Sequence, residues 1–381
     1  MNAKSAESSD RNERLRSIDV PLTVATALML AFGVVMVYSA SSYSAEVNYG
    51  NEYFFMTKQI IGCVGGAASM TLFTLLDYRK LKKARWFILG VGVLLLALVL
   101  IPGVGVENYG ARRWLNLGVT TLQSSEVARV SSVFCAGGYM RNGKKKVATA
   151  RGGRPLPVVG LGMCVLIMLE PSMSVTICLA LVMLTMLVMG GMRLLHMLFV
   201  LLPLVAAAVV LVLVEPYRLS RLFAFLDPWS SPLGEGYQLL QSYYALGSGG
   251  LFGVGLFNSR QKYLYLPFAE SDFIFSVIGE ELGLIGCAAV MAGYCFIVFR
   301  LISIARRAAD RFGCYIAGGM AALVGIQVLI NIAVVSGCIP PTGIPLPLIS
   351  SGSSALVVFC GGIGICQSVR LRSHASVRAL L

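Results

Sequence analysis

Five ionisable side chains stand out because they interrupt or border long apolar segments: Glu126, Arg129, Asp272, Glu280 and Glu281. A charged side chain inside a bilayer costs about 3 kcal/mol or more, so each is a candidate either for function or for a structural ion pair. Glu126 and Arg129 are three residues apart, close enough to pair along one helix. Their spacing leaves both interpretations open.

Asp272 follows Pro267 and Ser271 and precedes the apolar run Phe273-Ile274-Phe275. This order predicts a helix N-terminus with Ser271 as its N-cap. A carboxylate there could accept a proton as a general base, or it could simply complement the helix dipole. Without further information the pattern favours the dipole role. Glu280 and Glu281 would lie about 12 to 13.5 Å further along the helix, so we expect them to organise the helix bundle.

The composition shows which elements must carry these residues. Hydrophobic residues make up 57% of the 381 and charged residues only 13%, about half the usual share in a soluble domain. The apolar stretches divide into about ten segments near the length that crosses a bilayer. We place them at 19–41, 56–76, 86–102, 124–140, 156–170, 173–190, 195–214, 272–298, 314–337 and 347–369. The predicted fold is all-α, a polytopic integral membrane protein with about ten transmembrane helices.

Lys and Arg set the orientation, because cytoplasmic loops retain them. Placing the N-terminus in the cytoplasm puts most of the 31 Lys and Arg residues on that side. Both termini are then cytoplasmic, as tails 1–18 and 370–381, and 19–369 is one membrane domain. Residues 215–271 form a large extracytoplasmic loop between the seventh and eighth helices. The first span does not end in a cleavage site, so we expect it to be retained.

The net charge of +13 does not require a nucleic acid, because basic residues beside membrane spans are a topological signal. Nucleic-acid binding is therefore not expected. The ten cysteines include no Cys-x-x-Cys motif and lie almost entirely within apolar spans, which indicates packing rather than metal binding.

The large loop is rich in aromatic and apolar residues and is expected to be ordered. Residues 237–248 have helical spacing of Leu240, Tyr243 and Tyr244 beside polar residues, which predicts a short helix in the membrane interface. The glycines that follow favour tight turns over a nucleotide-binding loop, because no strand precedes them and no Gly-Lys-Ser/Thr sequence follows.

Motifs in this loop and around it resemble those of the SEDS family, which serves bacterial shape, elongation, division and sporulation. The first set is Asp227-Pro228-Trp229, Gly236-Tyr237-Gln238, Gln241-Ser242, Ser248-Gly249-Gly250, Gln261-Lys262 and Leu266-Pro267. The second is Gly110-Ala111-Arg112-Arg113-Trp114, Gln123-Ser124-Ser125-Glu126, Ser271-Asp272-Phe273-Ile274-Phe275 and Gly279-Glu280-Glu281-Leu282-Gly283. From Tyr38-Ser39-Ala40-Ser41 to Pro345-Leu346-Pro347 the likeness covers nearly the whole chain, and the division and sporulation members are the most similar.

The resemblance implies a peptidoglycan glycosyltransferase of the bacterial cytoplasmic membrane that polymerises lipid II beside a class B penicillin-binding protein, with other division or sporulation proteins as partners. It makes Asp272 the expected catalytic base. The leaving pyrophosphate needs positive charge, and the expected extracytoplasmic cations include Arg112, Arg113, Arg218, Arg221, Arg260 and Lys262. Of these we assign Arg112, Arg113, Arg218 and Lys262 to substrate binding, together with Trp114, which either stacks on a sugar or sits at the interface. Glu126, Arg129, Glu280 and Glu281 are expected to support the bundle. A divalent cation, Mg or Mn, is left open.

Several positions depart from the usual family pattern. Phe268, Glu270 and Ser271 stand where Glu, His and Thr are usual. Glu170-Pro171-Ser172-Met173-Ser174 stands in place of Gln-Pro-Asp-Leu-Gly, and Ser350-Ser351-Gly352-Ser353 in place of Ser-Tyr-Gly-Gly. These changes bear on substrate geometry and metal use more than on reaction class. Two alternatives remain open, a lipid II flippase and a scaffold that recruits its penicillin-binding partner without catalysis.

Overall fold

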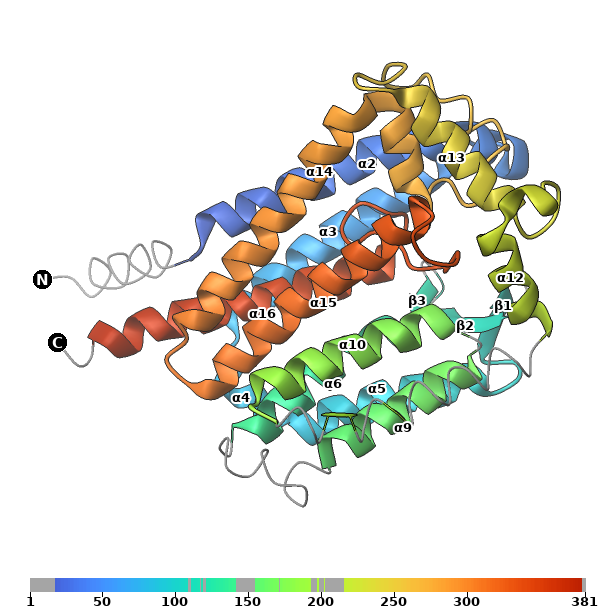
Figure 1. The fold of residues 1–381 in the computed structure, drawn as a ribbon. Coiled ribbons are helices and arrows are strands. Elements are labelled where there is room, and N and C mark those ends of the chain that lie inside the picture. Colours follow the sequence, from blue (N-terminus) through green and yellow to red (C-terminus); the bar gives the residue numbers. More distant parts are fainter. Residues whose placement is uncertain are drawn as a thin grey trace, which may run out of the picture.

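The computed structural model describes residues 18–108, 111–116, 118, 121–141, 155–170, 172–192, 197–198, 202 and 216–378. Most of these residues are helical, as predicted. The longer helices are α2 (Val20–Tyr49), α3 (Phe54–Leu75), α14 (Ile274–Arg306), α15 (Arg311–Val335) and α16 (Ser353–Arg378). Shorter ones are α4 (Tyr78–Leu81), α5 (Arg85–Leu100), α6 (Ser124–Met140), α9 (Pro155–Leu169) and α10 (Met173–Met189). Together they form a bundle whose helices run in roughly one direction across the molecule (Figure 1).

Nine of the predicted spans coincide with helices in the described part of the chain. The seventh, 195–214, falls almost wholly outside the described residues. Among those described, α2, α14, α15 and residues 353–373 of α16 are long and apolar enough to cross a membrane, and α5, α9 and α10 are shorter apolar helices. The expectation of a helical integral membrane protein is confirmed.

Close helix packing depends on small residues, as is usual where lipid removes the hydrophobic drive between helices. Gly62 of α3 faces Ser353 of α16, where an added Cβ would come within 2.7 Å of the Ser353 Cα. In the same way, Gly92 of α5 leaves room for the Ser131 hydroxyl of α6. These contacts bring α3 against α16 and α5 against α6.

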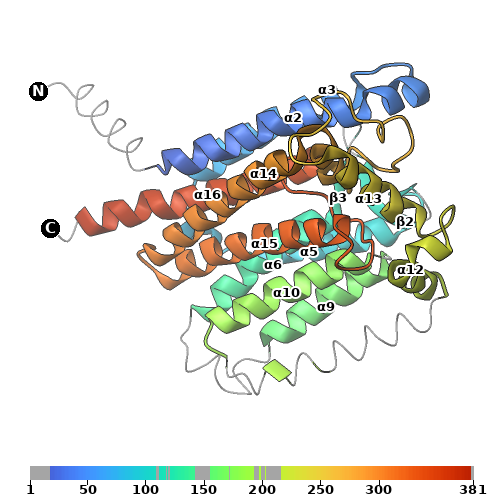
Figure 2. The ribbon, with the colours of Figure 1, turned by 45° about the horizontal axis from the view of Figure 1, so that its top comes forward.

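One end of the bundle carries elements that are not transmembrane helices, and we call it the site end. It holds α12 (Pro216–Leu226), the 3-10 turn η1 (Pro228–Ser230) and α13 (Tyr237–Gly249), with the C-terminal part of α16 at the opposite end (Figures 1 and 2). The helix predicted at 237–248 is therefore present as α13. The glycines after it form tight turns, with positive φ at Gly250, Gly253 and Gly255.

A small sheet at the site end did not follow from the sequence. It is antiparallel, in the order β1 (Gly105–Asn108), β2 (Ala111–Asn116) and β3 (Thr121–Gln123). Trp114 of β2 stands opposite both Val106 of β1 and Gln123 of β3. Because β3 runs directly into α6, the sheet fixes β2, with Arg112 and Arg113, at the site end of the bundle.

Candidate active site at the end of the bundle

Asp272 lies in the turn just before α14, which begins at Ile274. The prediction that Ser271 caps this helix is wrong. The N-cap residue is Phe273, it makes no side-chain cap bond, and the Ser271 carbonyl instead accepts a hydrogen bond from the Ser350 hydroxyl (2.6 Å). The turn is thus held by the loop between α15 and α16 rather than by its own helix.

Helix α15 fixes the backbone of Asp272 from a second side. The buried Asn331 amide of α15 donates to the carbonyls of Asp272 and Ile344, both at 2.8 Å. Gly343 lies close to the Asp272 side chain, because a Cβ added to it would be 2.9 Å from an Asp272 carboxyl oxygen. Asp272 therefore has a defined position although it precedes the helix.

Two departures from the family pattern shape the same turn. Phe268 adopts a left-handed backbone conformation with φ of 55°, and its carbonyl accepts hydrogen bonds from the Ser271 and Phe273 amides. The Ser351 amide donates to the Glu270 carbonyl (2.9 Å). Both contacts are made by the main chain, so they do not depend on the side chains usual in the family.

The Asp272 carboxyl is partly buried, and its protonation is balanced near neutral pH. Burial and, to a smaller extent, the charge of Glu270 raise its pKa to about 7 against the opposing effect of Arg113, Arg221 and a hydrogen bond from Ser271. Burial disfavours the charged form of a carboxyl, whereas nearby cations favour it. A carboxylate with a pKa near the working pH is well suited to take a proton from a hydroxyl.

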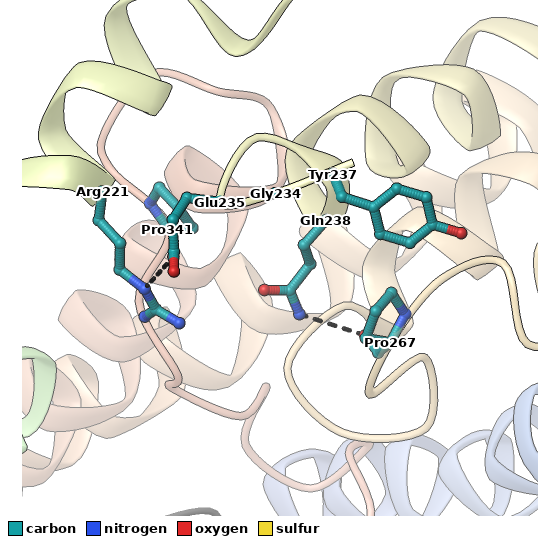
Figure 3. Close-up of a pocket in the computed structure, with 7 residues that line it drawn as sticks. All are labelled: Arg221, Gly234, Glu235, Tyr237, Gln238, Pro267 and Pro341. Carbon is teal, nitrogen blue, oxygen red and sulfur yellow. Dashed lines mark hydrogen bonds and ion pairs between the residues drawn. The ribbon is translucent and has the colours of Figure 1, made fainter. Parts of the chain in front are cut away.

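A pocket of about 160 Å³ opens at Pro267, which precedes this turn in the sequence (Figure 3). It is lined by Arg221, Gly234, Glu235, Tyr237, Gln238, Pro267 and Pro341. Arg221 of α12 bonds Glu235 (3.2 Å), and Gln238 of α13 donates to the Pro267 carbonyl (3.2 Å). Arg221 relates the pocket to Asp272, because its charge lowers the pKa of that carboxyl.

The cations that act on Asp272 come from two separate elements, Arg113 of β2 and Arg221 of α12. Arg113 was expected at the site. Arg221 was recognised only as one of the loop cations, because nothing in its own sequence neighbourhood predicts that α12 meets Asp272. Arg112 and Trp114 are half-buried on β2, and the side chain of Arg218 lies outside the described residues. Their expected roles stay predictions.

Lys262 makes a different kind of contact. Its side chain is buried, and its ammonium donates to the Phe257 carbonyl within its own loop. Next to it, Glu280 of α14 accepts hydrogen bonds from Ser259, Arg260 and Gln261. Glu281 accepts from Ser39 of α2 and from the Ser259 amide. We call Glu280 and Glu281 with residues 257–262 the loop anchor, because they tie the loop after α13 to the bundle.

Glu126 and Arg129 form an ion pair, as their spacing indicates, and both are fully buried. Arg129 also donates to Gln327 of α15, whose amide donates to the Pro345 carbonyl (2.8 Å). This pair connects α6 to α15 and to the loop that holds Asp272.

The described residues contain no group of three or more His, Cys, Asp or Glu side chains placed to hold a metal ion. Asp272 and Glu270 are the carboxyls of the turn before α14. Mg²⁺ is often held by one or two carboxylates together with substrate phosphates and water, so this donor set fits a metal carried in with a phosphate-bearing substrate.

The fold and this end of the bundle define a class of helical membrane protein with a partly buried carboxyl, Asp272, whose pKa is lowered by the charges of two arginines. The chain belongs to the cell cycle protein family of FtsW, RodA and SpoVE, whose model matches residues 20–375. This confirms the resemblance to the SEDS family.

Individual relatives agree with that assignment. Stage V sporulation protein E of Bacillus subtilis is 36% identical over 355 residues, covering 93% of this chain and 97% of the relative. A protein named probable peptidoglycan glycosyltransferase FtsW, from Thioalkalivibrio sulfidiphilus, is 38% identical over 356 residues, 92% of this chain and 89% of the relative.

Solved structures share the fold. One is described as "Structural coordination of polymerization and crosslinking by a peptidoglycan synthase complex", with a TM-score of 0.76, 26% identity and coverage of 94% of this chain and 98% of that chain. Another is the rod shape determining protein RodA of Thermus thermophilus, with a TM-score of 0.68, 25% identity and coverage of 93% and 96%.

Proposed function

We propose that this chain is a peptidoglycan glycosyltransferase that polymerises lipid II at the outer face of the bacterial cytoplasmic membrane during division or sporulation. The observation that carries the proposal is the Asp272 carboxyl, partly buried, fixed by the α15–α16 loop and acted on by Arg113 and Arg221. The relatives named as probable peptidoglycan glycosyltransferases support the reaction class.

The reaction joins two sugars. The hydroxyl of the acceptor attacks the anomeric carbon of the donor, a new C–O bond forms, and the bond from that carbon to the lipid pyrophosphate breaks. Asp272 takes the proton of the attacking hydroxyl, which requires its ionised form. Arg113 and Arg221 offset the negative charge that develops on the departing pyrophosphate. The site end then faces outward and both termini lie in the cytoplasm.

A class B penicillin-binding protein is the proposed partner, because polymer made here must be crosslinked by a transpeptidase. The similarity to a chain from a peptidoglycan synthase complex that couples polymerisation and crosslinking supports this partner.

A lipid II flippase needs a polar path through the bundle. The charged residues buried within α6, Glu126 and Arg129, neutralise each other and pack against Gln327. This arrangement favours a structural role for the pair over a polar path.

The test is polymerisation of purified lipid II by the detergent-solubilised chain in complex with its class B partner, which must lack glycosyltransferase activity of its own. Glycan strands from the wild-type complex, with equal yield from Glu46→Gln at the exposed end of α2, are the expected result. If no strands form under conditions in which a related complex makes them, the proposal fails. Lipid II translocation in vesicles then tests the flippase, and partner capture without either activity would indicate the scaffold.

A further inference from the structure

Glu170 lies in the turn between α9 and α10, and it contacts β2, the strand that carries Arg112 and Arg113. Its side chain is fully buried. The Ser124 hydroxyl at the start of α6 donates to one carboxyl oxygen (2.9 Å), and the Glu170 main-chain carbonyl accepts a hydrogen bond from Arg113 Nε (3.1 Å). Glu170 thus joins β2, α6 and the α9–α10 turn at one point.

The second carboxyl oxygen of Glu170 is buried and has no hydrogen-bond partner among the residues that the structure describes. A buried ionised carboxyl with so few hydrogen-bond donors costs free energy. It is therefore either stabilised by a cation in its neighbourhood or neutralised by binding a proton. Burial raises the pKa of Glu170 to about 7, while the Ser124 bond and the Arg113 charge oppose the rise. Both protonation states are therefore accessible near neutral pH.

Few charges face this carboxyl from the elements around it. Helices α9 and α10 contain no charged residue. On α6 the charged residues are Glu126 and Arg129, which pair with each other. Arg113 on β2 is the charge that acts on Glu170, and it acts on Asp272 as well. One guanidinium therefore lies under the influence of two carboxyls.

We propose that Glu170 is a positioning residue that orients Arg113 toward the pyrophosphate of the lipid substrate and, by gaining or losing its proton, sets how much of the Arg113 charge that pyrophosphate meets. This rests on the function proposed above. When Glu170 is neutral, the pair carries one positive charge. When Glu170 is ionised, the pair is close to neutral and attracts an anion less strongly.

The proposal assigns the pH dependence of KM to Glu170 and that of kcat to Asp272 over the same pH range. Rising pH ionises Glu170 and weakens substrate binding, so KM rises. Rising pH also ionises Asp272 and supplies the base, so kcat rises. A glutamine at this position would retain an oxygen for the Ser124 bond but would not titrate.

The experiment compares wild type, Glu170→Gln and the exposed control Glu46→Gln, measuring kcat and KM for lipid II between pH 6 and pH 8. In wild type and the control, KM rises by roughly threefold to tenfold, as expected for one partly buried charge interaction. In Glu170→Gln, KM stays at its low-pH value while the pH dependence of kcat is retained. Identical KM profiles in wild type and Glu170→Gln would overturn the proposal.

A second variant covers failure of Glu170→Gln to fold. Ser124→Ala removes the hydroxyl that favours the ionised form of Glu170, so the rise in KM should move to higher pH, and an unmoved rise contradicts the proposal. Fluorescence binding of lipid II over the same pH range gives a readout independent of turnover. A wild-type complex that binds with this pH dependence but makes no strands would sink the proposed function and leave the role of Glu170 standing.

Discussion

Two groups of carboxyls lie toward the site end of the bundle, and they differ in the groups that neighbour their charges. Glu280 and Glu281 in the loop anchor accept hydrogen bonds from a run of loop donors and from α2. Asp272 and Glu170 have few donors and share the influence of Arg113. The two groups are distinguished by their neighbours, which are backbone amides and serine hydroxyls for Glu280 and Glu281 and a guanidinium for Asp272 and Glu170. We therefore expect Glu280 and Glu281 to serve structure and Asp272 and Glu170 to serve chemistry.

The largest effect should come from breaking the anchor. Glu280→Ala removes the acceptor of three hydrogen bonds and leaves buried donors unsatisfied, at a cost of about 2 to 5 kcal/mol in the free energy of unfolding. The thermal melt of the solubilised chain measures this. If the melting temperature were unchanged, the structural role of Glu280 would be wrong.

Arg113→Ala should reduce kcat/KM for lipid II by roughly tenfold to a hundredfold, because a hydrogen bond to a charged group is worth about 1.5 to 3 kcal/mol. The melting temperature should change little, since Arg113 is half-buried at the end of the bundle. Arg113→Lys should restore part of the activity because it keeps the charge but not the fork. Full activity of the alanine variant would show that Arg113 does not take part in the reaction.

Acidification should change activity and stability in opposite directions. The pKa of Asp272 is raised to about 7 in the folded chain, above the ordinary carboxyl value, so the folded state binds the proton more tightly than the unfolded state. Stability from this group is present below the unfolded pKa and is lost as pH rises through about 7. In the opposite sense, kcat falls about tenfold per pH unit below 7 because the base is protonated.

The measurement is a pair of profiles, kcat and melting temperature from pH 5 to pH 8, for wild type and Asp272→Asn. The variant serves as the control, because the difference between the two melting profiles isolates Asp272 from Glu170 and Glu270, whose pKa values are also raised by burial. A melting difference that does not depend on pH would show that Asp272 does not titrate in this range.

Arg221→Ala should have the smallest effect, about 1 kcal/mol or less in kcat/KM. Its partner is Glu235, and both side chains of this pair are more than a third exposed, so solvent screens their charges. Steady-state kinetics at low and high salt measures the effect, which should shrink as salt rises. A loss as large as that of Arg113→Ala would mean that Arg221 acts directly on the reacting atoms.

The sequence predicted most of the fold because spans and ion pairs are local features. Apolar stretches near 20 residues mark the helices, and the i, i+3 spacing of Glu126 and Arg129 gave their pair. The start of α14 at Ile274 was missed, because hydrogen bonds from Asn331 and Ser350 hold the preceding turn more firmly than a cap on Ser271. Such contacts join residues far apart in the chain.

The site was predictable only in part for the same reason. The family motifs predicted Asp272 and Arg113 as site residues, and these assignments stay predictions. The effect of Arg221 on Asp272 depends on the position of α12, which the sequence does not predict. The contact of Glu170 with Arg113 depends on the three-stranded sheet, whose strands are too short and too rich in charged and aromatic residues to be recognised in the sequence. Lys262 was expected beside the substrate, and its buried contact with the Phe257 carbonyl comes from the folding of the loop on Glu280.

The most direct test of the account is lipid II polymerisation by Asp272→Asn in complex with the class B partner, beside wild type and Glu46→Gln. Asparagine keeps the size of the side chain and removes the base. We expect at least a hundredfold loss of strand synthesis, the usual contribution of a general base, with unchanged complex formation and an intact melt. Strand synthesis at close to the wild-type rate would contradict the assignment of Asp272 as the base.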